Sequence, residues 1–252
     1  RMVAEARAIA RVNHVNVVAV HDVGTAGDEV FVGMELVDGC NLTQWLEQAP
    51  RSWSEVVAVF CKVGSGLAAV HAAGLIHRDV KPANILVDDA GRVRVTDFGL
   101  ARASMDAPTV LDGSERAMVE DSVMAQRLDL TMTGAYLGTP AYMSPEQFGG
   151  VVVSEMSDQF GFAVSLWESL YRVLPFSGKS FATLREAVLS GTQRPPPTGT
   201  GVPRWLHEIV ARGLCQDPCD RWPSMAAMVE ALAAGDPRKR VRRWWSVAAA
   251  AT

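Results

Sequence analysis

The sequence predicts an α+β fold in which a small strand region precedes a mostly helical body. Two apolar runs, residues 17–23 and 30–37, flank the segment G-T-A-G-D-E, a pattern typical of two strands joined by a turn. From Ser54 to Gly74 the apolar residues recur at the helical period, which predicts one long and largely buried helix. Beyond residue 150 every apolar pattern is helical, so the helical body follows the strands.

The other elements follow from the same periodicities. Apolar residues at helical spacing in residues 2–12 predict a short opening helix, which Asn13 and Asn16 end. Asn41, with Gln44 three residues later, resembles the cap of a second helix. Further helices are expected around residues 158–171, 181–189, 205–214 and 224–232.

Composition indicates a folded protein with no general attraction for nucleic acid. The 252 residues are 48% hydrophobic, which is ample for a packed core, and the net charge is −4. The four cysteines are too few and too scattered for a disulfide scaffold, which favours a reducing, cytosolic compartment. Cys215 and Cys219 have no second pair or histidine cluster nearby, so a zinc site is not expected.

A predicted hairpin brings two oxygen-bearing side chains together. Residues 85–87 and 93–95 are predicted to form short strands around a D-D-A-G turn. An antiparallel hairpin returns the chain to its starting point, so Asn84 and Asp97, which flank the two strands, are expected to lie side by side. A carboxylate and a carboxamide at one edge suit Mg²⁺, which takes few protein ligands and completes its shell with water and phosphate oxygens.

Two charged residues precede this hairpin on a loop that must reach the same edge. Asp79 supplies a carboxylate that is able to act as a base, and Lys81 supplies a fixed positive charge. Together with Asn84 and Asp97 they form the set that phosphoryl transfer requires: a base, a charge that offsets the phosphate, and two metal ligands.

Three motifs, taken in order, resemble those of protein kinases. They are H-R-D-V-K-P-A-N at 77–84, D-F-G at 97–99 and G-T-P-A-Y-M-S-P-E at 138–146. The likeness runs from residue 1 to about residue 234, and Lys81 and Thr139 make it most similar to the bacterial serine/threonine kinases of eukaryotic type. It implies a protein-kinase-like fold, with residues 1–37 as a partial small β lobe and residues 38–234 as the large helical lobe.

The resemblance assigns roles to the residues already named. Asp79 would orient and deprotonate the substrate hydroxyl, and Lys81 would bind the phosphate of ATP as it transfers. Asn84 and Asp97 would hold magnesium. The cofactors implied are ATP and Mg²⁺, and the partners are protein substrates that carry serine or threonine.

Further matching positions surround the nucleotide. Glu5 corresponds to the helix glutamate that pairs with the family's ATP-gripping lysine. Met34 corresponds to the back of the adenine pocket, and Glu35 and Val37 would offer backbone groups to the adenine edge.

Other matching positions are structural. Glu146 and Arg221 correspond to a buried ion pair of the helical lobe, and Asp158 to an aspartate that braces the catalytic loop from below. His77 is expected to pack in the core rather than to transfer protons.

The chain also departs from the family pattern at its N-terminus. The family's glycine-rich loop and strand lysine normally precede the helix that bears Glu5, and only residues 1–4 precede it here. We therefore expect a truncated fragment that is itself inactive. The alternative is a pseudokinase or docking module without transfer activity, which the intact set around Asp79 disfavours. Small-molecule kinases of related fold are disfavoured by the long segment 97–146.

The segment after the D-F-G motif carries the expected regulatory sites. Residues 107–128 are predicted to be an insertion rich in polar and small residues. Thr131 and Thr133 are expected to be activating phosphorylation sites, because a phosphate there would pair with Arg78; the alternative is two solvated loop threonines. Thr139 is assigned instead to contacts with the catalytic loop. A homodimer is one arrangement that would allow autophosphorylation.

Residues 235–252 are predicted to be a basic juxtamembrane segment. Five basic residues between Arg238 and Arg243 are followed by two tryptophans, an order typical of the cytoplasmic end of a spanning helix. Only nine residues follow Arg243 and a span needs about twenty, so we expect a longer protein that is anchored in the membrane with the kinase-like part in the cytoplasm. A peripheral anchor on anionic lipid and, less favoured, a nucleic-acid-binding tail are the alternatives.

Overall fold

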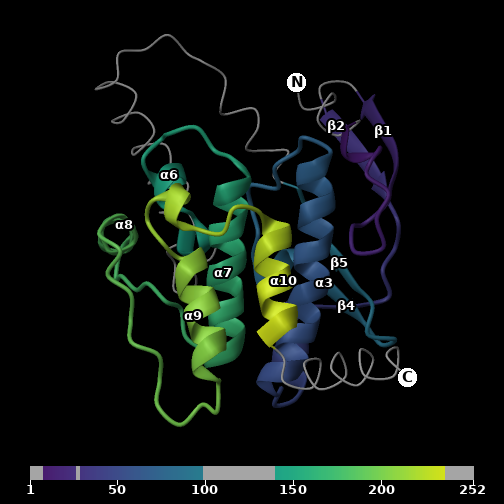
Figure 1. Ribbon diagram of the computed structural model, residues 1–252. Coiled ribbons are helices and arrows are strands. Elements are labelled where there is room, and N and C mark those ends of the chain that lie inside the picture. The colour runs from purple at the N-terminus through teal and green to yellow at the C-terminus, as the bar shows by residue number, and fades with distance from the viewer. Residues whose placement is uncertain (1–7, 27–28, 99–139, 236–252) are drawn as a thin grey trace, which may run out of the picture.

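The computed structural model confirms the α+β prediction, with two small sheets beside a body of packed helices (Figure 1). It describes residues 8–26, 29–98 and 140–235. The helices α3 (Trp53–Ala72), α7 (Glu155–Tyr171), α9 (Arg204–Gly213) and α10 (Met225–Gly235) pack on one another in the centre of the molecule. In Figure 1 the labelled strands β1, β2, β4 and β5 lie on one side of α3, opposite α7.

The first sheet is the hairpin that the two apolar runs predict. β1 (Val20–Ala26) pairs antiparallel with β2 (Glu29–Met34). The first strand begins later than its apolar run because Val17 and Val18 pair instead with Val95 of the second sheet. One apolar run therefore pairs with both sheets, which the pattern of apolar residues alone does not reveal.

The second sheet has the order β3-β4-β5, and its β4–β5 hairpin is the one predicted from sequence. β4 (Ile85–Asp88) and β5 (Val93–Val95) pair antiparallel, and β3 (Gly39–Asn41) adds an unpredicted strand at the edge. At Gly39 a Cβ atom would lie 2.5 Å from the carbonyl oxygen of Val87, so the close approach of β3 requires glycine.

The helices predicted after residue 41 are all present, with ends shifted by a few residues. The cap at Asn41 is a capping box, since the side chain of Asn41 accepts from the Gln44 N–H and the Gln44 side chain accepts from the Asn41 N–H. Of the predicted opening helix, only its last turn lies within the described residues. The remaining elements are α2 (Leu42–Gln48), α6 (Pro145–Phe148), α8 (Phe181–Leu189) and the short 3₁₀ turns η1 (Pro82–Asn84), η2 (Pro140–Tyr142) and η3 (Pro218–Asp220).

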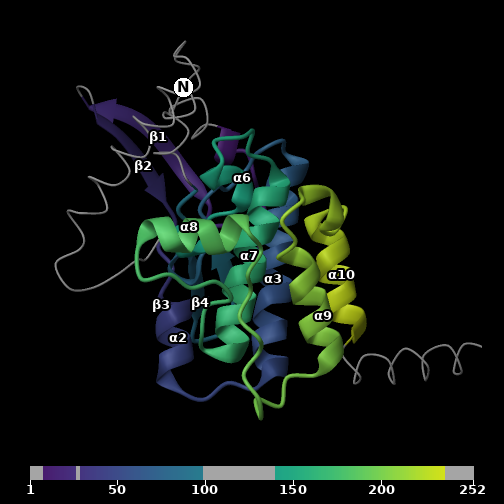
Figure 2. The ribbon, with the colours of Figure 1, turned by 90° about the vertical axis from the view of Figure 1, so that its left-hand side faces the viewer.

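The main core is built around α3 and α7. Phe60 of α3 meets Phe162 of α7 edge to face, with ring centroids 5.2 Å apart. The small helices α6 and α8 pack together on the side of α7 that faces away from α3 (Figure 2). Gly66 lets α3 approach the strand region, because a Cβ there would lie 2.5 Å from the Asn16 carbonyl oxygen.

Among the described helices, α3 alone has the length and apolar composition of a membrane span. Half of the apolar stretch in Trp53–Ala72 is buried inside the fold. Its composition is thus accounted for by its place at the centre of the core.

Candidate active site

The catalytic loop brings together three residues that the sequence places in one site. The Lys81 Nζ lies 2.7 Å from Asp79 Oδ2. The Asn84 side-chain amide donates to the same Asp79 oxygen at 3.1 Å and to the Asp79 carbonyl oxygen at 2.9 Å. One carboxylate oxygen of Asp79 is therefore held between a cation and an amide, which fixes the direction of the carboxylate.

The β4–β5 hairpin places Asp97 beside Asn84, as its antiparallel pairing requires. The Thr96 N–H donates to the Asn84 carbonyl oxygen at 3.0 Å, so the residue next to Asp97 is bonded directly to Asn84. Asp97 is exposed and Asn84 is buried. Because the Asn84 Nδ2 is engaged with Asp79, the Asn84 side-chain oxygen is the atom that could hold a metal ion.

Two residues of this site have left-handed backbone conformations. The φ angles are 69° at Arg78 and 55° at Asp97, and Arg172 is the only other described non-glycine residue with positive φ. Such conformations are unfavourable for residues with a Cβ and persist where surrounding contacts impose them. The backbone directly before Asp79 and at Asp97 is thus held in place by the fold.

Asp158 holds the backbone of the catalytic loop from below. Its fully buried carboxylate accepts from the backbone N–H of His77 at 2.8 Å and of Arg78 at 2.7 Å. The ring of His71, at the end of α3, contacts the same carboxylate at 2.8 Å. Because Asp158 belongs to α7 and also contacts α3, it links the catalytic loop to two core helices.

His77 is placed as a packing residue. It is fully buried, its Nε2 lies 2.9 Å from the Thr96 carbonyl oxygen, and its ring lies 4.8 Å from that of Phe98. Burial lowers the pKa of His77 below its ordinary value, so the imidazole is neutral near pH 7. The Phe98 side chain in turn packs with Ile9 and Val70 in a second, smaller apolar cluster.

Glu146 and Arg221 form the ion pair that the resemblance implies. The guanidinium donates to both carboxylate oxygens, at 2.8 and 2.9 Å, and Ser157 Oγ donates to the same carboxylate at 2.7 Å. Burial by itself would raise the pKa of Glu146, but the hydrogen bonds and charge of Arg221 outweigh it and hold that pKa below its usual value. The pair fastens α6, which follows the G-T-P motif, to the helical body.

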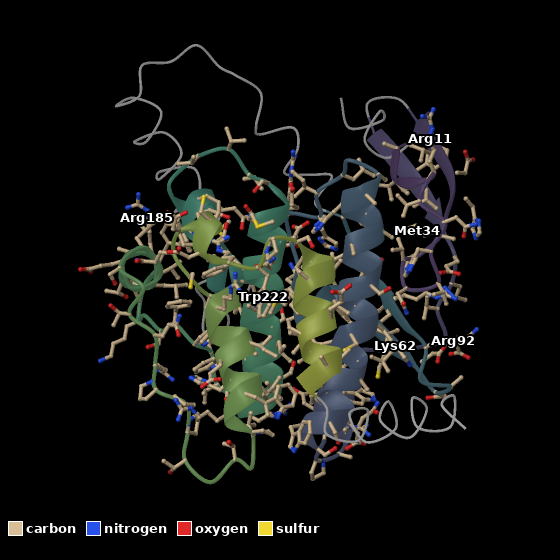
Figure 3. All side chains as sticks on the ribbon, viewed as in Figure 1. Arg11, Met34, Lys62, Arg92, Arg185 and Trp222 are labelled. Carbon is tan, nitrogen blue, oxygen red and sulfur yellow. The ribbon has the colours of Figure 1, made fainter. Side chains whose placement is uncertain are left out.

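The segment expected to face adenine follows β2. Met34, the last residue of β2, is partly exposed on the strand side of the molecule (Figure 3). The Glu35 N–H donates to the Ala19 carbonyl oxygen at 2.9 Å, so the Glu35 carbonyl oxygen is the backbone group left for a ligand. Val37 is half-buried two residues later.

Other predicted sites lie outside the described residues. They are Glu5, the insertion at 107–128, the threonines Thr131, Thr133 and Thr139, and the basic segment. Their roles remain predictions.

Two contacts in the layer beside the catalytic loop were not predicted from the sequence. The Tyr142 hydroxyl donates to the Glu168 carboxylate at 2.6 Å, and the Gln147 side chain donates to the Arg78 carbonyl oxygen at 3.0 Å. Burial raises the pKa of Glu168 despite this hydrogen bond. A small pocket lies between this layer and the catalytic loop; its lining includes Asp79, Tyr142 and Gln147. Of these residues, only Gln147 has a recognisable sequence pattern, the capping box of α6. That pattern indicates a helix cap and does not indicate a contact with the catalytic loop.

Comparison with known proteins identifies the family. The sequence profile described as the protein kinase domain matches residues 1–232. Serine/threonine-protein kinase PknL of Mycobacterium tuberculosis is 39% identical over 234 residues, which cover 91% of the chain and 53% of that relative. Serine/threonine-protein kinase PknA of the same species is 33% identical over 240 residues, which cover 93% of the chain and 50% of PknA.

A probable serine/threonine-protein kinase of Clostridium perfringens is 32% identical over 227 residues, which cover 89% of the chain and 30% of that relative. The chain thus spans about half the length, or less, of these curated relatives. The family match covers most of the chain and includes the loop, hairpin and ion pair described above. On these grounds the chain belongs to the protein kinase domain family.

Proposed function

We propose that the protein to which this chain belongs transfers the γ-phosphate of ATP to serine and threonine side chains of proteins. The observation that carries the proposal is the convergence of Lys81 and Asn84 on one carboxylate oxygen of Asp79, at 2.7 and 3.1 Å. The names of the bacterial relatives support serine and threonine as the acceptors.

The chemistry assigns a separate task to each side chain. Transfer forms a bond between the substrate hydroxyl oxygen and the γ-phosphorus, and it breaks the bond from that phosphorus to the oxygen that leaves with ADP. Asp79 orients the hydroxyl and accepts its proton as the new bond forms. Lys81, adjacent to the same carboxylate, places a fixed positive charge where negative charge gathers on the transferring group.

Asn84 and Asp97 are the residues that would hold magnesium. Their donor set is one amide oxygen and one exposed carboxylate, and Mg²⁺ commonly binds through few protein oxygens of this kind. When bound, the ion neutralises phosphate charge and orients the phosphate chain. The fixed direction of Asn84, set by its bonds to Asp79, links the metal position to the position of the base.

Two threonines outside the described residues are proposed, from the sequence alone, to regulate the activity. Thr131 and Thr133 are proposed activating phosphorylation sites, with autophosphorylation between two copies as one route. Mass spectrometry of the active full-length protein that found neither threonine modified would contradict this assignment.

The basic segment 235–252 is proposed to precede a membrane anchor. Cell fractionation tests it. Recovery of the full-length protein in the soluble fraction at low salt contradicts any anchor, and release by high salt alone leaves only a peripheral one.

The proposed activity is tested with purified full-length protein, γ-labelled ATP and peptides that carry a single serine, threonine or tyrosine. The expected result is label on the serine and threonine peptides that disappears when magnesium is removed. Transfer mainly to tyrosine contradicts the assigned specificity. Binding of ATP without transfer to any peptide contradicts the enzyme and favours the docking module.

A further inference from the structure

We infer that the ion pair between Glu35 and Arg94 is a positioning device that sets the affinity of the site for ATP. The inference rests on the proposed function, because it concerns the segment expected to face adenine. Glu35 begins the crossing from β2 to β3, which consists of residues 35–38. Leu36 in this crossing is 95% exposed, so its side chain does not pack the crossing against the body.

The β1–β2 hairpin is joined to the body by two crossings that are held differently. The first, residues 16–18, is fixed to β5 by backbone hydrogen bonds of 2.9 Å from Val95 N–H to Asn16 and from Val18 N–H to Val95. Within the part of the chain that the structure describes, residues 36–38 of the second crossing make no hydrogen bond. The position of the second crossing therefore depends on the contacts that Glu35 makes at its start.

The Glu35 carboxylate ties three segments together. One of its oxygens accepts from the Ala19 N–H at 3.2 Å and from the guanidinium of Arg94, in the middle of β5. Between described residues, this is the only ion pair that joins the β1–β2 region to the second sheet. The two side chains are only 23% and 18% exposed, so water and salt screen the pair less than a surface pair.

Fixing this crossing before a ligand arrives has a direct consequence for binding. A segment already held in its bound position loses less conformational freedom when a ligand binds, and affinity rises accordingly. Asp79 lies on a different segment with its own contacts to Lys81 and Asn84. Loss of the Glu35–Arg94 pair is therefore expected to weaken ATP binding while the rate of transfer at saturating ATP stays the same.

The chain offers a matched control on the same hairpin. Arg92 pairs with Asp88 at the turn, its side chain is 62% exposed, and it lies at the outer edge of the molecule (Figure 3). Arg92→Met and Arg94→Met remove the same charge from neighbouring positions. Val93 and Val95, which flank Arg94, are buried and paired in the sheet, so the backbone of β5 is expected to persist in both variants.

The test measures kcat and the KM for ATP in the full-length protein. Arg94→Met is expected to raise the KM about fivefold with kcat within about twofold of wild type, whereas Arg92→Met leaves both unchanged. Glu35→Gln should match Arg94→Met, and the double variant should be no worse than either single one. Arg94→Lys, which keeps the charge, should recover most of the affinity.

Hydrogen exchange gives a second readout that needs no activity. Arg94→Met should speed exchange at the amides of Ala19 and Glu35, relative to Arg92→Met. A wild-type KM in Arg94→Met, or one that rises equally in Arg92→Met, overturns the inference and leaves the proposed function intact. If the wild-type protein binds ATP but transfers no phosphate, the proposed function is overturned. The inference about the ion pair then requires that Arg94→Met raise the dissociation constant for ATP about fivefold.

Discussion

Replacement of Arg221 by methionine is expected to destabilise the helical body severely. Arg221 is fully buried, and its guanidinium donates to both Glu146 oxygens, at 2.8 and 2.9 Å. Methionine fills part of the same volume but leaves the Glu146 carboxylate buried without its cation. It also removes donors from the carbonyl oxygens of Cys215, Met156 and Gln216, at 2.8, 2.7 and 3.1 Å.

The magnitude follows from this loss of compensation. Removal of one partner of a buried ion pair costs about 3–5 kcal/mol in the free energy of unfolding. For a domain of this size each kcal/mol lowers the Tm by roughly 2–4 °C, so the expected fall is roughly 6–20 °C. Urea denaturation followed by tryptophan fluorescence measures the free energy, and a thermal scan measures the Tm.

The matched control is Arg204→Met, which breaks the exposed 2.8 Å pair with Glu208. A surface pair of this kind contributes about 0.5 kcal/mol or less, so the control should resemble wild type. A loss of stability in Arg221→Met no greater than that in the control would refute the predicted role of the Glu146–Arg221 pair.

The pH dependence supplies a further check on the same pair. Because the folded pKa of Glu146 lies below its ordinary value of 4.5, its stabilising contribution is present above that value and is lost as pH falls through the folded pKa. The difference in free energy of unfolding between wild type and Glu146→Gln should therefore become smaller at acid pH. A difference that stays constant from pH 7 to the acid end contradicts this account.

The remaining predictions concern the hairpin and the loop. Gly39→Ala should cost about 1–3 kcal/mol in urea denaturation, because its Cβ would lie 2.5 Å from the Val87 carbonyl oxygen; wild-type stability would rule out that clash. The free energy of unfolding should fall as pH drops below 6.5, the ordinary pKa of histidine, because His77 binds a proton more readily in the unfolded chain than in its buried position. The variant His77→Gln should lack this pH dependence, and an unchanged pH dependence would contradict the explanation. Asp158→Asn should lower kcat by about tenfold or more with little change in the KM for ATP, since it loosens the backbone N–H groups of His77 and Arg78; a wild-type kcat would refute that role.

The sequence predicted the elements whose patterns are local. The hairpin around the D-D-A-G turn and the Asn41 cap appear as expected, because turn chemistry and capping depend on residues a few positions apart. β3 was missed because three residues carry no alternating pattern and its pairing depends on a glycine that lies close to β4. The start of β1 shifted because Val17 pairs with a strand almost eighty residues away.

The site shows the same division between local and distant contacts. The neighbourhood of Asn84 and Asp97 followed from antiparallel pairing alone. Asp158 and the Glu146–Arg221 pair were placed only through the family resemblance, since no spacing rule connects residues so far apart in the chain. The Glu35–Arg94 pair was not predicted at all, because each residue is unremarkable in its own segment and they meet only when β5 packs beside the crossing.

The central claim is that Asp79 is the base of a phosphoryl-transfer site. The most direct measurement compares wild type and Asp79→Asn in the full-length protein, with single-turnover transfer from ATP and ATP affinity measured on the same preparations. The account predicts that transfer falls by roughly two to four orders of magnitude while ATP affinity stays within about twofold. Transfer by Asp79→Asn at a rate near that of wild type would contradict it.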